Sequence, residues 1–304
     1  MRLFFLALII GLIGMQNRGA AEEGQNLPTD VKVTYIANAG FLIQVNNKKV
    51  LVDALFKDVE NEFYDCPSTE LTQRIIDGEG EFAEIDLVAS THEHIDNFDE
   101  KIVASVLVNH PESKFLSCSK TIDQLGNNSQ YQRFKKQLVS ITPERMMHID
   151  TLINGIEVRT YRISHGPYFI EDPLTGRKTD LYKFAEHVAF RFTIDGVTIF
   201  HCGDSNSNAL AEYEQLRLDR DELDFAFLGR GFLYQPQGQG VAIMKKYIQA
   251  KHYVIMQIQH EDNEYYKEVA GAVKSELPSI KVFEKESESR TYNITPLQGA
   301  LTSH

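Results

Sequence analysis

The sequence has little of what a polyanion-binding protein needs. Lysine and arginine together number 31, against 43 aspartates and glutamates, and the formal net charge is -12. The sequence contains no long basic run and no aromatic-rich segment on which bases could stack. Because nucleic-acid binding depends on clustered Lys and Arg side chains that neutralise phosphates, this composition argues against a nucleic-acid partner.

Cysteine is also scarce, and the chain has only three: Cys66, Cys118 and Cys202. An oxidising compartment permits one disulfide among them and leaves at least one thiol, and the sequence does not choose the pair. A chain of 304 residues can bury a core large enough to fold without a disulfide framework.

A long apolar run occurs at the N-terminus. Residues 3–14 follow Arg2, and small residues occupy positions 19–21. The run is shorter than the roughly 20 residues that span a bilayer, but it suits the apolar segment of a secretory signal peptide. We therefore expect residues 1–21 to be a cleaved signal peptide and the protein to be exported, periplasmic or secreted. A lipid anchor would need a cysteine near the cleavage site, and none is there, so no stable membrane anchor is expected. A buried N-terminal helix is the alternative to a signal peptide.

No repeat, low-complexity tract or linker divides residues 22–304, which we expect to form a single domain. Short strands joined by turns come first, and strand-like and helix-like patterns then alternate. This order predicts an α+β fold of two sheets with helices outside them. The expected strands are residues 31–36, 41–45, 48–53, 85–90, 114–117, 156–163, 187–194, 197–201, 224–228, 252–256 and 280–283. The expected helices are residues 68–77, 99–108, 119–138, 208–216, 241–248 and 263–277.

The apolar run at residues 85–90 leads into a motif of the form His-x-His-x-Asp. His92 and His94 are two residues apart, a spacing that can place both imidazoles on one side of an extended or loop backbone. Asp96 adds a carboxylate oxygen two residues later. Two nitrogens and one oxygen suit zinc or a similar first-row metal. A surface loop with two scattered histidines is the alternative that this motif alone leaves open.

Three further candidate ligands lie at or just beyond the ends of expected strands: His165, Asp204 and His260. Loops at strand ends can bring such side chains into one cleft. Taken singly, they are better explained as a turn cap, a helix cap and a surface residue. Taken together with the motif, they predict one shared transition-metal site.

In this order the residues resemble the pattern of the metallo-β-lactamase superfamily, especially its branch of small-molecule hydrolases that includes the ascorbate-phosphate lactonase-like proteins. The resemblance covers residues 31–283, and the segment at residues 35–41 looks like the glycine-containing first hairpin of that branch. The family pattern is an Asp ending an early strand, His-x-His-x-Asp-His, a lone His, an Asp after a Gly, and a final His. The matching residues here are Asp53, His92, His94, Asp96, His165, Asp204 and His260.

The resemblance implies a four-layer αβ/βα sandwich with the metal site at one edge of its two sheets. It also implies that His92, His94 and His165 hold a first metal. Asp53 would then hydrogen-bond the loop that carries His92 instead of binding metal, and a simple strand-end turn is the alternative for this residue.

A second metal would be held by Asp96 and His260, with Asp204 bridging the two metals or lying close to both. The sequence departs from the family at Asn97, where the pattern has a histidine. An amide oxygen is a poorer ligand for zinc than imidazole. We therefore expect one firm zinc site and a second that is weak or absent, with manganese or iron as alternatives to zinc.

A metal with an open coordination position lowers the pKa of bound water and polarises a substrate oxygen. The prediction is an exported hydrolase that uses metal-bound hydroxide on a small ester, lactone or phosphodiester. Asp96 or Asp204 would orient the water or protonate the leaving group. The preference for an ester or lactone comes from the branch resemblance alone. A mononuclear iron oxygenase stays open as an alternative, and so does a non-catalytic metal- or metabolite-binding protein, which Asn97 suggests.

The substrate-facing residues are less defined by the sequence. Arg230 and Tyr234 follow an expected strand, where an arginine can hold a carboxylate or phosphate and a tyrosine can donate a hydrogen bond. Residues 168–182 can act as a lid. A solvated arginine, a packed tyrosine and an ordinary surface insertion are the respective alternatives. The sequence indicates neither the substrate nor the number of subunits.

Overall fold

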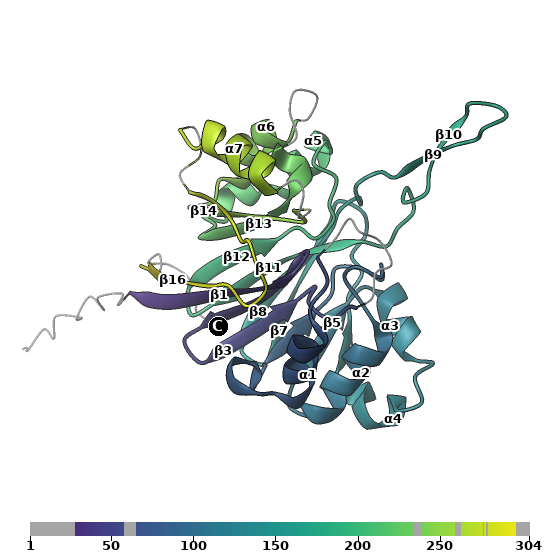
Figure 1. Ribbon diagram of the computed structural model, residues 1–304, viewed down its shortest axis with the longest axis vertical. Coiled ribbons are helices and arrows are strands. Elements are labelled where there is room, and N and C mark those ends of the chain that lie inside the picture. Colours follow the sequence, from purple (N-terminus) through teal and green to yellow (C-terminus); the bar gives the residue numbers. More distant parts are fainter. Residues whose placement is uncertain are drawn as a thin grey trace, which may run out of the picture.

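The computed structural model describes residues 28–57, 65–233, 239–258, 263–275, 277 and 279–295. Two seven-stranded sheets pack face to face, and helices cover the outer face of each (Figure 1). This arrangement confirms the expected α+β fold with four layers. The expected signal peptide, residues 1–21, lies outside the described residues. Within the described part of the chain, no helix combines the length and apolar character needed to cross a bilayer.

The first sheet comes mainly from the N-terminal half of the chain, in the order β16-β1-β2-β3-β4-β5-β6. Its strands β1 to β3 pair antiparallel, and β3 to β6 pair in parallel. The last strand, β16, returns to pair antiparallel with β1. The strands are β1 (Thr29–Ala37), β2 (Gly40–Val45), β3 (Lys48–Val52), β4 (Leu87–Ala89), β5 (Lys114–Ser117), β6 (Leu138–Ser140) and β16 (Ser289–Ile294).

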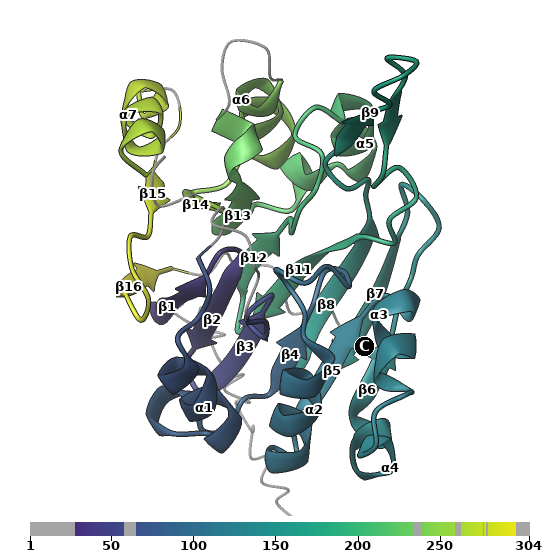
Figure 2. The same cartoon turned by 45° about the vertical axis from the view of Figure 1, so that its right-hand side comes forward.

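The second sheet has the order β15-β14-β13-β12-β11-β8-β7. Antiparallel pairing runs from β7 to β12 and parallel pairing from β12 to β15. The strands are β7 (His148–Ile153), β8 (Ile156–Arg162), β11 (Val188–Ile194), β12 (Val197–His201), β13 (Phe225–Gly229), β14 (His252–Met256) and β15 (Ile280–Val282). A separate hairpin of β9 (Phe169–Glu171) and β10 (Lys178–Asp180) projects from the body of the molecule (Figures 1 and 2).

Helices cover the outer face of each sheet (Figure 2). Those on the first sheet are α1 (Thr69–Asp77), α2 (Glu100–Asn109), α3 (Ser119–Leu125) and α4 (Tyr131–Phe134). Those on the second are α5 (Leu210–Leu216), α6 (Gly240–Ile243), which continues as a π-helical turn at Met244–Ile248, and α7 (Asn263–Val273). Side-chain caps define where α1 and α2 begin. The Ser68 hydroxyl accepts a hydrogen bond from the Leu71 amide, and the Asp99 carboxylate accepts from the Lys101 and Ile102 amides.

Successive side chains along the strands divide between two cores, because they point to opposite faces of a sheet. In β2, Phe41 and Ile43 lie in the core between the sheets, whereas Leu42 packs in the cluster under the helices of the first sheet. The rings of Phe41 and Phe227 meet edge to face across the sheets, with centroids 4.9 Å apart. None of the three cysteines is paired with another, and only Cys66 is exposed.

Most expected elements are present; β4 and α7 are shorter than expected, and one expected helix is interrupted. The helix expected at residues 119–138 is broken between Leu125 and Tyr131. The Asn128 side chain accepts a hydrogen bond from the Gln130 amide, which is a local turn that competes with helix. The strands β6, β7, β9, β10 and β16 were not predicted.

Candidate metal centre

Those residues expected to bind metal that the structure describes lie where strands of the two sheets end at a common edge. His92 and His94 are in the loop after β4, His165 follows β8, and Asp204 follows β12. An isolated backbone bridge between His165 and Ser205 joins the last two loops. The structure therefore brings together side chains from three segments that are far apart in the sequence.

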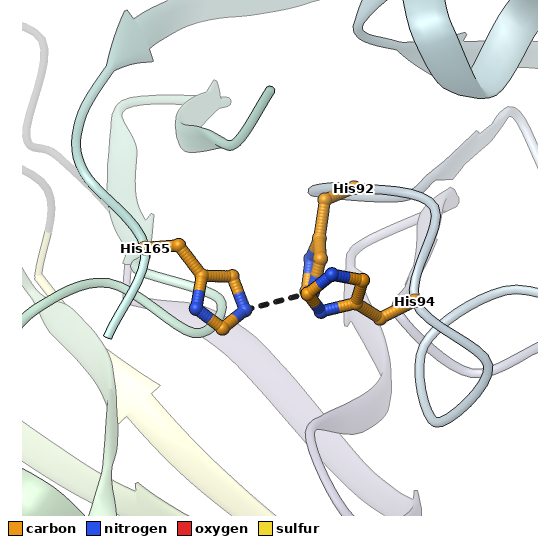
Figure 3. Close-up of side chains that lie close together, drawn as sticks. All are labelled: His92, His94 and His165. Carbon is orange, nitrogen blue, oxygen red and sulfur yellow. Dashed lines mark hydrogen bonds between the residues drawn. The ribbon is translucent and has the colours of Figure 1, made fainter. Parts of the chain in front are cut away.

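Three imidazoles form the centre of this cluster (Figure 3). Nε2 of His92 lies 3.2 Å from Nε2 of His165, and one ring nitrogen from each of His92, His94 and His165 lies within 4.8 Å of the others. Oδ2 of Asp204 lies 3.9 Å from Nε2 of His92 and 3.7 Å from Nε2 of His165. Three nitrogens and a carboxylate oxygen are the ligand types that zinc and iron bind.

Hydrogen bonds on the far side of two rings decide which nitrogen carries the proton. Nδ1 of His165 lies 2.6 Å from the Gly166 carbonyl oxygen, which only accepts, so Nδ1 donates. The Thr91 hydroxyl donates to Asp53 over 2.8 Å and therefore accepts from Nδ1 of His92 over 3.0 Å. In the neutral imidazoles both Nε2 atoms then present lone pairs to each other. This arrangement is repulsive unless a proton or a cation lies between them, and it fits a metal site.

Burial keeps the imidazoles neutral. It lowers the pKa of His94 to about 4, with the nearby His165 and Lys120 adding to the effect. Burial and the neighbouring histidines hold the pKa of His92 well below its usual value, and burial also lowers the pKa of His165. Because a metal ion binds the neutral form of imidazole, these rings are ready to act as ligands at neutral pH.

Two acidic side chains complete the cluster. Burial raises the pKa of Asp204 to about 6. Burial and the charge of Asp204 raise the pKa of Asp96 to about 7. The Asn38 side-chain amide holds Asp96 through its backbone oxygen at 3.0 Å and its Oδ2 at 3.3 Å. A nearby cation would stabilise both ionised carboxylates, so this pair also fits a metal ion.

The cluster opens into a cleft of about 570 Å³, a size typical of small-molecule sites. Tyr168, Tyr182 and the polar residues 205–208 are among the residues that line it. Arg230, from the turn after β13, also lines the cleft, and its positive charge acts to lower the pKa of Asp204. A substrate in this cleft would therefore lie against His165 and Asp204.

The sequence matches the beta-lactamase superfamily domain over residues 32–224, which is more than half of the chain. The chain belongs to the metallo-β-lactamase superfamily. This confirms the family resemblance read from the motif and from the later histidine and aspartate. None of the curated proteins compared with the sequence matches it.

Several solved structures share the fold. Igni18, a metallo hydrolase from the archaeon Ignicoccus hospitalis, is 18% identical, with a TM-score of 0.57 over 87% of this chain and 99% of its own. The isothiocyanate hydrolase from Delia radicum gut bacteria is 16% identical, with a TM-score of 0.55 over 86% and 100%. The diiron β-hydroxylase CmlA from Streptomyces venezuelae is 12% identical, with a TM-score of 0.55 over 87% and 54%. At these identities the likeness is one of fold.

Asn97 occupies the place of a histidine in the metallo-β-lactamase pattern. The residue is buried, and its Nδ2 donates to Oδ1 of Asp204 over 3.3 Å. Its Oδ1 has no hydrogen-bond partner among the described residues. Two residues singled out in the sequence, His260 and Tyr234, lie outside the described residues.

Asp53 lies beneath the histidine loop, at the end of β3, with a φ of 45°. Its Oδ1 accepts from the Thr91 amide over 2.7 Å, and its Oδ2 accepts from the Thr91 hydroxyl over 2.8 Å. Thr91 directly precedes His92 and contacts its ring. Asp53 thus holds the loop that carries His92, which is the role implied by the family resemblance.

Two buried histidines beside the cluster, His187 and His201, were not predicted from the sequence to belong to the site. The ring centroid of His187 lies 5.2 Å from that of His92 and 5.5 Å from that of His165. His201 accepts from the Gly203 amide through Nδ1 over 3.2 Å, and so holds the turn that carries Asp204. A histidine next to or inside an apolar strand, as at 187 and 201, is the signal that would have found them.

Proposed function

We propose that the protein is a metal-dependent hydrolase of a small ester, lactone or phosphodiester. The observation that carries this proposal is the cluster of His92, His94 and His165, with lone pairs of two rings facing each other and the Asp204 carboxylate within 4 Å of both. A cluster of this composition at the base of a cleft suits hydrolysis of a substrate that binds in the cleft. An ester or lactone is preferred because of the branch resemblance.

A bound ion would supply positive charge that polarises a substrate oxygen and lowers the pKa of water. The protein's own side chains would bind the ion, orient the water and transfer protons. His92, His94 and His165 would hold the ion, and Asp204 would orient the attacking water. Asp96 lies close enough to Asp204 for the two carboxylates to interact, and the ion would stabilise its ionised form. As a carboxylate, Asp96 would accept a proton from the attacking water and pass it to the leaving group.

We propose one firmly bound ion, with zinc as the first choice and manganese or iron as alternatives. Asn97 directs an N–H, not a lone pair, at Asp204. An imidazole at this position would offer a nitrogen ligand instead. We expect metal analysis to find about one ion per chain, and the Asn97→His variant to bind a second. Two ions in the natural protein would contradict this proposal.

The test of hydrolysis is a panel of lactones, phosphodiesters and β-lactams, with His94→Ala as the control variant. Turnover should depend on the bound metal, fall on chelation and be lost in His94→Ala. The Phe184→Ala variant, altered at a strongly exposed position, should keep it. Absence of metal-dependent turnover across the panel, in protein that holds its metal, would count against the enzyme proposal.

An iron oxygenase is the second candidate, because CmlA, described as a diiron β-hydroxylase, has a similar fold. Metal analysis of protein purified without added metal separates the two. Stoichiometric iron with oxygen consumption favours the oxygenase, and zinc with hydrolysis favours the first proposal. If Asn97→His gains hydrolysis that the natural protein lacks, the natural protein is a non-catalytic binder.

We also propose that the protein is exported to the periplasm or secreted, after removal of residues 1–21. The apolar run and the small residues before position 22 support this. Mass spectrometry of the protein isolated from the producing cells should find Glu22 as its first residue. A mature chain that begins at Met1 would overturn the proposal.

A further inference from the structure

His165 and His187 both lie beside His92, and the chain between them forms the β9–β10 hairpin. The hairpin projects from the body of the molecule (Figure 1). Two tyrosines flank this hairpin in the sequence. Tyr168 is next to β9 and Tyr182 is close behind β10, and both line the cleft that holds Asp204. We call Tyr168 and Tyr182 the tyrosine platform.

One carboxylate holds the two halves of the platform together. Oδ1 of Asp180 accepts from the Tyr168 amide over 3.1 Å and from the Tyr182 amide over 3.0 Å. The Leu181 amide donates to the Tyr168 carbonyl over 2.9 Å. The two rings stack at an interplanar angle of 28°, with their centroids 5.5 Å apart. The platform is therefore set by its own hydrogen bonds before any ligand arrives.

Tyr182 also packs directly against the candidate metal ligands. Its ring centroid lies 4.3 Å from that of His94 and 4.7 Å from that of His165. Burial, together with the charges of Asp96 and Asp204, raises the pKa of its hydroxyl. Behind it, Tyr168 remains 53% exposed. Aromatic surface thus extends from the histidine cluster to the open cleft.

We infer that the tyrosine platform selects substrates with an aromatic group next to the bond that is cleaved. This inference rests on the proposed function and adds a substrate class to it. A flat group that enters the cleft can stack on the partly exposed rings while its reacting group lies at His165 and Asp204. Aromatic pairs contribute beyond the area that they bury, by an amount that corresponds to a three- to tenfold gain in affinity. Phe232 and Tyr266 also line the cleft but are buried, so the partly exposed rings of the platform are the aromatic surface that a ligand in the cleft can reach.

The test compares two phosphonates that share an anionic head and differ in the ring. Calorimetry measures the binding of phenylphosphonate and methylphosphonate to the full protein with its metal, and metal content is measured on each sample. We expect phenylphosphonate to bind about three- to tenfold more tightly. Tyr182→Ala should remove this preference, Tyr182→Phe should retain it, and Tyr168→Ala should weaken it without disturbing the histidines. Phe184→Ala is the control, because Phe184 is 87% exposed and does not line the cleft with the platform.

If protein that holds its metal binds the two phosphonates with equal affinity, the inference about the tyrosine platform is wrong, whereas the proposed metal-dependent function is not affected. A preference that survives Tyr182→Ala overturns the inference as well. A sample that binds neither metal nor phosphonate overturns both proposals. Light scattering gives a further outcome: a dimer that Tyr168→Ala dissociates would show that the platform is buried against a second copy, which is incompatible with substrate binding there.

Discussion

Metal affinity should fall steeply as the pH is lowered from 7.5 to 5.5, because the ion must displace protons from Asp96 and Asp204. Burial raises the pKa of Asp96 to about 7 and that of Asp204 to about 6. Both carboxyl groups hold protons below these values and are ionised above them. Protons therefore oppose metal binding in acid, and the opposition disappears as the pH rises through 7.

The magnitude follows from about 1.36 kcal/mol per pH unit. At pH 5.5, deprotonating Asp96 costs about 2 kcal/mol and deprotonating Asp204 about 0.8 kcal/mol, whereas at pH 7.5 both costs together are about 0.2 kcal/mol. The difference corresponds to roughly a 100-fold weaker affinity at pH 5.5. His94, with a pKa lowered to about 4 by burial, stays neutral over this range and adds little.

The assay is competition for zinc against a chromophoric chelator at pH 7.5, 6.5 and 5.5. Asp96→Asn removes the larger contribution, so its affinity should fall only about fourfold over the same range. Asp123→Asn, altered on the exposed side of α3, should keep the full 100-fold change. A flat pH profile in the natural protein would refute the reasoning, and so would an unchanged slope in Asp96→Asn.

Gly203→Ala should lower the free energy of unfolding by about 2–4 kcal/mol, because the residue has a φ of +53° and a β-carbon would come within 2.5 Å of the Thr91 hydroxyl. Denaturant titration checks this against Gly271→Ala, where a β-carbon meets nothing within 4 Å and stability should hold or rise; equal stability of the two variants would contradict the geometry. Tyr182→Trp places a single tryptophan in a chain that has none, and its fluorescence should be quenched by one equivalent of cobalt(II). Phe184→Trp, at an 87% exposed position, should be quenched less, and the reverse order would mean that Tyr182 does not lie at the metal.

Strands could be predicted where a short apolar run is bounded by turn residues. The segment Val197–His201 follows Asp195 and Gly196, whose φ angles are 49° and 78°. An Asp-Gly pair favours this tight hairpin turn, so the turn and both of its strands were visible in the sequence. The strands β1 to β3 were predictable for the same reason, because apolar runs bounded by turn residues form them.

The strands that were not predicted lie where burial gives no pattern. In β7 only Ile153 is buried, because this strand forms the edge of its sheet. All three residues of β9 are exposed, and two of the three in β10. Pairing there depends on backbone hydrogen bonds and on the neighbouring chain, which leave no periodic signal in the sequence.

The candidate site, like the fold, has a part that the sequence predicted and a part that it did not. Candidate ligands at strand ends could be expected to converge, and His92, His94, His165 and Asp204 do meet at one edge of the sheets. The Asp53 and Thr91 contacts that hold His92 follow from the motif and its strand, but His187, which packs against His92 and His165, comes from the other sheet. Such contacts depend on how the two sheets face each other, and no local spacing encodes that.

The hydrogen bonds around the histidines argue for a metal ion independently of the family. A purely structural pair would place a proton between Nε2 of His92 and Nε2 of His165, which lie 3.2 Å apart. Both Nδ1 atoms are already committed as donors, to the Thr91 hydroxyl and to the Gly166 carbonyl. A proton at Nε2 would therefore make one ring cationic, yet burial lowers the pKa of both rings. A cation held by both lone pairs resolves this conflict without charging an imidazole.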